Sequence, residues 1–151
     1  MSDAVNALVF HYADDARVAL PPHTSTALVE AAELVEVPAA PYFCKHLLRW
    51  QNQWLPVLEL QSLLNASPSH QPPRGTHVLV VAYQAAKNAA IEYGALRLVG
   101  LPLMVPVTDA MACDLPATSD YWSQIAISCF EYEGQPVPVL DTKQLFAAAH
   151  A

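Results

Sequence analysis

The residues best suited by type to chemistry are Cys44 and His46, which form a Cys-x-His pair. A thiolate and an imidazole at this spacing could begin a zinc site, or could place a base beside a nucleophilic thiol. A structural zinc site needs about four ligands, and the other cysteines, Cys113 and Cys129, lie far away without a Cys-x-x-Cys pattern. The sequence therefore favours a buried small thiol beside a surface histidine, and we predict no catalytic residue, metal or cofactor.

Two acidic residues, Glu59 and Asp141, hold equivalent places in a weak internal repeat. Residues 53–64 match residues 135–146, sharing one Gln, one Pro, one Val and two Leu. The repeated unit is predicted to be a hairpin, an apolar strand, an acid and a helical turn. A carboxylate at a helix start accepts hydrogen bonds from unpaired N–H groups, so helix capping is favoured over a catalytic pair. Asp141 and Gln144 are predicted to form a capping box.

The composition indicates a folded, soluble domain that meets a protein partner. The 151 residues are 54% hydrophobic and only 14% charged, whereas soluble domains are about 25% charged. A net charge of −7 argues against nucleic acid and against anionic membrane surfaces. The N-terminus lacks the pattern of a signal peptide, and the charge-free run in the most apolar region, 98–108, is too short to span a bilayer. Three cysteines suit a reducing cytosol, so we expect a cytoplasmic protein without membrane insertion, and self-association is left open.

The elements that must position these residues are short strands. Thirteen prolines separate short runs rich in Val, Leu and Tyr, which is typical of an all-β domain. A short helix over 27–32, capped by Thr24 or Ser25, and a C-terminal helix over 141–149 are the predicted exceptions. A Pro- and Ser-rich loop at 65–76 divides the chain into two pseudo-repeated halves. The predicted strands are 8–12, 17–20, 34–37, 47–50, 54–60, 77–83, 90–99, 103–107, 128–132 and 137–140.

Two tryptophans flank the first predicted hairpin turn. In the strand after the turn, Trp54 and Leu58 share one face and Leu55 and Val57 the other, which is typical of a strand buried on both sides. We therefore predict that Trp54 lies in the core. Trp50 fits the core and an interface equally well, because Trp is enriched at interface hot spots.

The sequence at these two hairpins resembles a known family. Residues 46–60 read HLLRWQNQWLPVLEL, similar to the pattern Gly-x-x-Asn-Leu-Arg-Gly-x-x-x-Pro-Val-hydrophobic-Asp-Leu of the CheW-like coupling proteins of bacterial chemosensory systems. Residues 133–141, EGQPVPVLD, resemble the ending of that family's second half. The resemblance implies one domain over 1–151, built from two small interleaved five-stranded barrels of SH3-like type with short helices. It also implies a non-catalytic adaptor that joins chemoreceptor cytoplasmic domains, bound between the barrels, to a CheA-type histidine kinase docked on one of them.

The departures from the family pattern concern the partner more than the fold. Gln51 stands in the place of the motif's arginine, Asn52 and His46 replace its two glycines, and Arg49 replaces its asparagine. Gln cannot make the bidentate, charge-assisted contact of Arg, whereas Asn tolerates the positive φ of a tight turn. By position in the motif, the predicted partner contacts are Arg49, Trp50, Gln51 and Asn52.

These departures favour a divergent or accessory member of the family, for example in a type IV pilus (twitching) chemosensory cluster. Three alternatives stay open at this point. The chain could be a repurposed scaffold for a different partner, a barrel that binds a small ligand in a pocket between its halves, or a small hydrolase that depends on Cys44.

Overall fold

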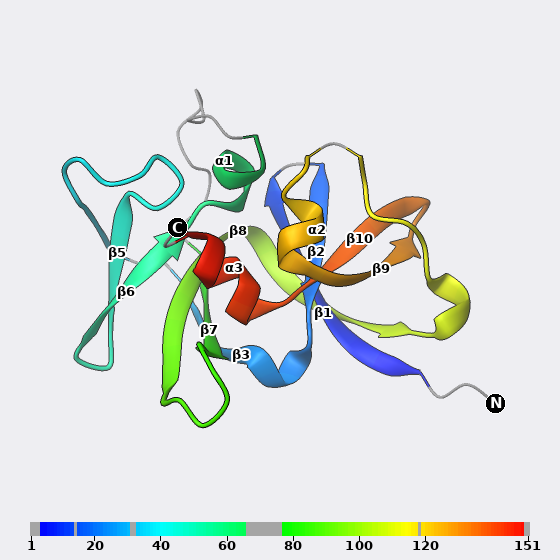
Figure 1. Cartoon of the computed structure of the whole chain (residues 1–151), viewed down its shortest axis with the longest axis horizontal. Helices are drawn as coiled ribbons and strands as arrows, with labels where there is room; N and C mark the ends of the chain where they lie inside the picture. The colour runs from blue at the N-terminus through cyan, green and yellow to red at the C-terminus, as the bar shows by residue number, and fades with distance from the viewer. Residues whose placement is uncertain (1–3, 14, 31–32, 66–76, 118, 150–151) are drawn as a thin grey trace.

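Strands dominate the chain, as Figure 1 shows. The computed structural model describes residues 4–13, 15–30, 33–65, 77–117 and 119–149, so residues 66–76 of the predicted loop lie outside the described part. The strands are β1 (Val5–Ala13), β2 (Ala16–Leu20), β3 (Ser25–Val29), β4 (Leu34–Glu36), β5 (His46–Trp50), β6 (Gln53–Leu58), β7 (His77–Gln84), β8 (Ile91–Val107), β9 (Ala126–Tyr132) and β10 (Gln135–Leu140). The helices are α1 (Leu60–Asn65), α2 (Trp122–Ile125) and α3 (Thr142–Ala149), with 3₁₀ turns η1 (Pro22–Thr24) and η2 (Asp109–Met111).

The strands form two barrel-like halves that share β8. Barrel one has the order β3-β7-β8-β6-β5, with β4 added beside β5, and barrel two has the order β8-β1-β2-β10-β9. The two regions predicted as separate strands, 90–99 and 103–107, are one continuous strand whose first part belongs to barrel one and whose second part belongs to barrel two. Gly100, at φ +80°, lies where the strand passes between them. The expected all-β fold with two interleaved five-stranded barrels is confirmed.

The internal repeat corresponds to equivalent pairings in the two barrels. In barrel one, Val57 of β6 pairs in parallel with Ala95 of β8. In barrel two, Val139 of β10 pairs in parallel with Ala19 of β2. Val57 and Val139 occupy the same position in the repeat, and a helix follows each strand. The repeat therefore reflects two copies of one supersecondary unit: an antiparallel hairpin, a parallel pairing and a helix.

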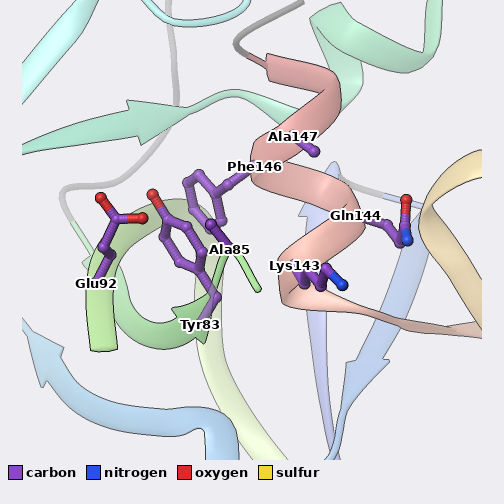
Figure 2. A pocket seen from close by; sticks show the side chains of 7 residues that line it. All are labelled: Tyr83, Ala85, Glu92, Lys143, Gln144, Phe146 and Ala147. Carbon is purple, nitrogen blue, oxygen red and sulfur yellow. The ribbon is translucent and has the colours of Figure 1, made fainter. Parts of the chain in front are cut away.

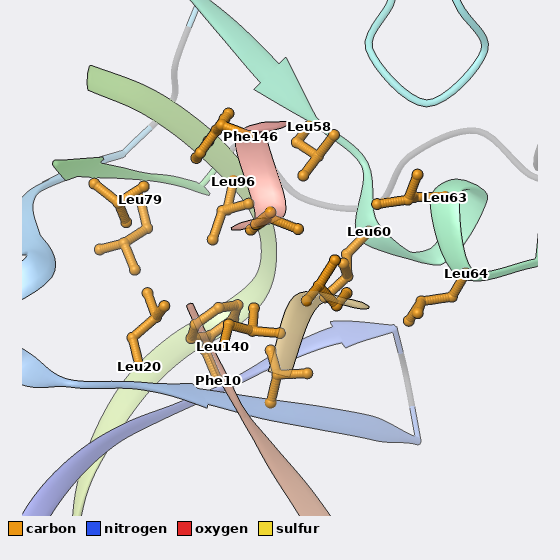
Figure 3. Packing of buried hydrophobic residues seen from close by; sticks show 14 of the residues in the cluster. Phe10, Leu20, Leu58, Leu60, Leu63, Leu64, Leu79, Leu96, Leu140 and Phe146 are labelled. Atoms are coloured by element: carbon orange, nitrogen blue, oxygen red, sulfur yellow. The ribbon is translucent and has the colours of Figure 1, made fainter. Parts of the chain in front are cut away.

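Three clusters of buried apolar side chains stabilise the arrangement. The interior of barrel one is filled by Leu48, Leu55, Val57, Val78, Val80 and Ala95. The interior of barrel two is filled by Ala7, Val9, Ala19, Val105, Phe130 and Val137. The largest cluster, here called the central cluster, lies between the barrels and takes side chains from both and from all three helices (Figure 3). Its members include Phe10, Leu20, Leu58, Leu63, Leu79, Leu96, Trp122, Ile125, Leu140, Leu145 and Phe146.

Two helices, α1 and α3, each follow a strand of one barrel and pack against a strand of the other. α3 follows β10 of barrel two but packs on β7 of barrel one, where Thr142 Oγ1 donates to the carbonyl oxygen of Ala82 at 3.0 Å. Figure 2 shows the Phe146 ring stacked on Tyr83, with centroids 4.8 Å apart and an interplanar angle of 9°. α1 follows β6 of barrel one, and its Leu64 carbonyl accepts a hydrogen bond from Ser119 Oγ, ahead of α2, at 2.8 Å. This exchange of helices interleaves the barrels.

The start of α3 confirms that Asp141 caps the helix but contradicts the predicted capping box. Asp141 Oδ1 accepts a hydrogen bond from the backbone N–H of Lys143 at 3.0 Å, so the acid does cap the helix. The predicted capping box with Gln144 is wrong, because the backbone N–H of Asp141 donates to the Ile125 carbonyl at 2.9 Å instead. Leu145 and Phe146 pack into the body as predicted.

The predicted helix over 27–32 is wrong in its described part. Residues 25–29 form β3, which pairs antiparallel with β7, and residues 31–32 lie outside the described part. The 3₁₀ turn η1 precedes the strand, and Thr24 Oγ1 donates to the Pro21 carbonyl at 2.8 Å rather than capping a helix. β7 is apolar and needs a partner on its second edge, so tertiary pairing overrides the weak helix propensity of this segment.

Candidate partner-binding site

The first hairpin, β5–β6, carries the predicted contact residues on a two-residue turn. Gln51 has φ +47° and Asn52 has φ +62°, and positive φ at both central residues is the signature of a type I′ turn. The expected positive φ of Asn52 is confirmed, and Gln51 adopts it as well. Gln53, predicted as part of the turn, is the first residue of β6 and pairs with Trp50.

Trp50 faces the interior of barrel one. Its ring packs against the barrel-one cluster and lies 5.2 Å from the ring of Tyr93, centroid to centroid, at 55°. The side chain is half-buried. Of the two interpretations left open for Trp50, core packing is therefore the one the contacts favour, and its role at the site is to support the hairpin from within.

Trp54 lies outside the barrel, so the prediction that it is a core residue is wrong. Its side chain is 53% exposed, and the guanidinium carbon of Arg49 sits 5.8 Å from the centroid of its ring. Leu55 fills the barrel interior, so alternation turns Trp54 outward. Leu58, assigned to the same face, is buried because the end of β6 enters the central cluster. The sequence contained evidence for an exposed Trp54. A two-residue turn places Arg49 directly opposite Trp54, and Arg is rarely buried without a partner.

The exposed tryptophan belongs to a continuous outer surface of three strands. Val35 of β4 pairs with Leu47 of β5, and Leu47 pairs with Pro56 of β6. Alternation along these strands puts all three on the side of Arg49 and Trp54. We call this surface the hairpin face, defined by Val35, Leu47, Arg49, Trp54 and Pro56. It combines an exposed aromatic ring, a cation and aliphatic surface, the composition of protein-interface hot spots.

The second hairpin, β9–β10, has the same type of turn, but its tip is bound by a side chain from β2. Glu133 and Gly134 have φ +51° and +78°. Arg17 of β2 forms an ion pair with Glu133 at 3.1 Å, donates to the Tyr132 carbonyl at 3.2 Å and lies 4.9 Å from the Tyr132 ring centroid. Gln51, which takes the place of Glu133 in the first hairpin, is neutral and exposed. Both tips are exposed, and the first hairpin differs in having no charge at this position for the protein itself to pair.

Exposed apolar side chains from two different strands border the central cluster. Leu28 of β3 is opposite Leu79, a buried member of that cluster, yet is itself exposed. Met104 of β8 is opposite Leu8, which packs against the same cluster, and Met104 is 50% exposed. Directly opposite residues share a face of the sheet. We call Leu8, Leu28 and Met104 the seam, because they flank the junction between the barrels.

Cys44 and His46 do not meet the other cysteines. Cys44 is near Glu59, and burial, followed by the negative charge of Glu59, raises the pKa of the Cys44 thiol. A raised pKa disfavours the thiolate that nucleophilic chemistry needs. His46 Nδ1 is buried without a hydrogen-bond partner among the described residues. Within those same ranges no three His, Cys, Asp or Glu side chains are grouped to hold a metal ion.

Glu59 and Asp141, equivalent in the repeat, have different partners. Glu59 Oε1 lies 3.1 Å from Arg97 Nε, and both side chains are about seven-eighths buried, at 14% and 13% exposure. The parallel register that pairs Leu58 with Leu96 brings the next residues, Glu59 and Arg97, together. In barrel two the equivalent parallel register places Asp141 opposite Pro21, which carries no charge. Asp141 caps α3 instead.

Two hollows lie between elements of different barrels. A cleft of about 430 Å³ is bordered by the β1–β2 hairpin, α1, the segment before α2 and β10, with Tyr12, Gln61, Ser119 and Trp122 in its lining. A smaller hollow of about 170 Å³ lies between α3 and β7–β8, where Figure 2 shows Lys143 and Glu92 around the Tyr83–Phe146 stack.

Comparison with known proteins identifies the family. The CheW-like domain family matches residues 7–101, well over half of the chain. Among solved structures, the scaffolding protein TtCheW from Thermoanaerobacter tengcongensis superposes with a TM-score of 0.69 at 12% identity, covering 93% of this chain and 90% of that protein. No curated protein sequence matches, and none of the described helices has the length and apolarity to cross a bilayer. The chain belongs to the CheW-like domain family.

Proposed function

We propose that this protein is a non-catalytic cytoplasmic adaptor of a bacterial chemosensory pathway, coupling chemoreceptor cytoplasmic domains to a CheA-type histidine kinase. The observation that carries the proposal is the exposed Trp54–Arg49 pair, located in the family's most recognisable motif. An adaptor needs two surfaces that can be occupied at once. The hairpin face on barrel one and the seam between the barrels are two such surfaces, formed by different residues.

The hairpin face is the proposed kinase contact. Trp54 supplies a large rigid apolar anchor, and Arg49 supplies a cation beside it. Gln51 and Asn52 extend the contact at the exposed tip of the turn, while Trp50 holds the turn against barrel one from inside. The seam, with Met104 and Leu28, is the proposed receptor contact, since it offers exposed apolar side chains at the junction of the barrels.

Capture from the native cell lysate with tagged protein tests both contacts separately. Trp54→Asp is expected to lose the kinase and keep the receptor, and Met104→Glu is expected to lose the receptor and keep the kinase. Loss of one hot spot weakens binding by about 30-fold. Ile127→Asp, on an exposed residue of β9, is the matched control and should retain both. If Trp54→Asp captures as much kinase as the unaltered protein, the hairpin-face assignment is wrong.

Gln51→Arg in the same assay measures how far the altered motif limits docking. Arg restores a bidentate donor at the tip of the turn, so kinase capture is expected to increase, most clearly at low salt. Capture of an unrelated protein that requires Trp54, with neither kinase nor receptor recovered, would replace coupling by a repurposed scaffold.

The 430 Å³ cleft supports small-ligand binding as a second candidate function, because that interpretation predicts a pocket between the halves. Gln61→Trp fills the cleft from α1, on an exposed residue. If the protein is an adaptor alone, this variant captures kinase and receptor as the unaltered protein does.

A further inference from the structure

Cys113 and Cys129 are distant in sequence but adjacent in space. Their Sγ atoms lie 3.4 Å apart, and the backbone N–H of Cys113 donates to the Cys129 carbonyl at 3.0 Å. Ala112 and Phe130, the neighbouring residues, form an antiparallel bridge. The two cysteines are therefore directly opposite each other in a short antiparallel pairing between the segment after η2 and β9, and opposite positions have the Cα and Cβ spacings that a disulfide accepts.

We propose that Cys113 and Cys129 are a reversible dithiol–disulfide pair that is oxidised by exchange with a low-molecular-weight disulfide such as oxidised glutathione. In the first step the Cys113 thiolate attacks one glutathione sulfur, a mixed disulfide forms and one glutathione thiolate leaves. In the second step Cys129 loses its proton to solvent and attacks the Cys113 sulfur, which releases the second glutathione thiolate. The two cysteines lose two electrons and two protons, and one oxidised glutathione becomes two reduced molecules.

The surroundings of the two thiols indicate which of them reacts first. Cys113 is half-buried and can be reached from solvent, whereas Cys129 is buried at 6% exposure. Burial, followed by the hydrogen bond and the charge of Cys113, raises the pKa of Cys129 to about 12. The last two causes come from Cys113 itself, so they are removed once the Cys113 sulfur is in the mixed disulfide. Formation of the mixed disulfide at Cys113 thereby prepares Cys129 for the second step.

The disulfide would close a loop of the chain that contains α2. The residues between the two cysteines include Trp122 and Ile125, which lie in the central cluster, and Ser119, which donates to the Leu64 carbonyl of α1. This segment connects barrel two to the junction of the barrels. Oxidation would hold both of its ends together at β9, and so restrict how far the segment can move away from the central cluster.

The test is equilibration of the whole protein in glutathione buffers of increasing oxidised fraction, followed by denaturation, thiol counting and peptide mapping. The free-thiol count is expected to fall from three to one, with a linked Cys113–Cys129 peptide and a higher Tm. The Cys44→Ser variant should fall from two to zero. The Cys113→Ser variant should form no internal link and show no rise in Tm.

Several outcomes would overturn the proposal. These are glutathione that stays attached to Cys113 without transfer to Cys129, oxidation confined to Cys44, disulfide-linked dimers as the main product, or three free thiols at the poise of an oxidising compartment. None of these measurements uses a kinase or receptor, so the result is independent of the adaptor function.

Discussion

Phe146→Ala is expected to lower the free energy of unfolding by about 3–5 kcal/mol, the usual cost of removing a buried aromatic side chain. The ring is 1% exposed, belongs to the central cluster and stacks on Tyr83. It also anchors α3, a helix contributed by barrel two, on barrel one. Urea denaturation followed by tryptophan fluorescence measures the change. Lys143→Ala, on an exposed residue of the same helix, is the control and should change stability by less than about 0.5 kcal/mol.

Gly94 supplies an independent check on the same contact. A Cβ built on Gly94 would clash with the ring of Phe146, so the ring or α3 would have to move. Gly94→Ala is therefore expected to cost about 1–3 kcal/mol by overpacking. In the Gly94→Ala/Phe146→Ala double variant the added methyl group enters vacated space, so the loss should be smaller than the sum of the single losses. Simple additivity would mean that the two residues do not touch.

Arg97→Met is expected to lower the free energy of unfolding by about 3 kcal/mol, because it leaves the buried Glu59 carboxylate without its cation. Cys44 is close enough to Glu59 to be influenced by its charge, and it provides no compensating cation. The same denaturation experiment measures the loss. The expected loss lies at the low end of values for buried pairs, since each side chain retains about one-eighth of its exposure.

The matched control for the ion pair is Glu59→Gln/Arg97→Met. Removing both charges abolishes the desolvation cost together with the attraction, so this double variant should be more stable than Arg97→Met alone. If the single Arg97→Met variant is as stable as the unaltered protein, Glu59 is better hydrated than its burial indicates, and the ion pair does not stabilise the junction of β6, α1 and β8.

Local patterns predicted most of the strands but not their partners. Runs of Val and Leu between prolines located β7 and the β5–β6 and β9–β10 hairpins, because strand formation there needs only neighbouring residues. β3 was missed, since residues 25–29 become a strand through pairing with β7, which is distant in sequence. The continuity of β8 was missed for the same reason: its two parts serve different barrels, and the change falls at Gly100.

The partner-binding role of the candidate site stays a prediction, whereas the structure does show on which faces its residues lie, and one of these faces was predicted wrongly. The motif identified Arg49, Trp50, Gln51 and Asn52, and the structure places Gln51 and Asn52 on an exposed turn while Trp50 packs inward. Trp54 was assigned to the core by counting apolar residues on both faces of its strand. Counting apolar residues on each face is misleading for β6, because the two ends of this strand are buried in different places. Leu55 lies inside barrel one, whereas Leu58 lies in the central cluster between the barrels.

The exchange of helices between the barrels also constrains how the protein is made. During synthesis β1 and β2 leave the ribosome long before β10, the parallel neighbour of β2. All strands of barrel one precede β9 and β10, yet its β7 is covered by α3, which follows β10. Barrel two and the central cluster therefore cannot be completed before β10 and α3 have been translated. Until then the apolar strands that face the central cluster are open to chaperones and to neighbouring nascent chains.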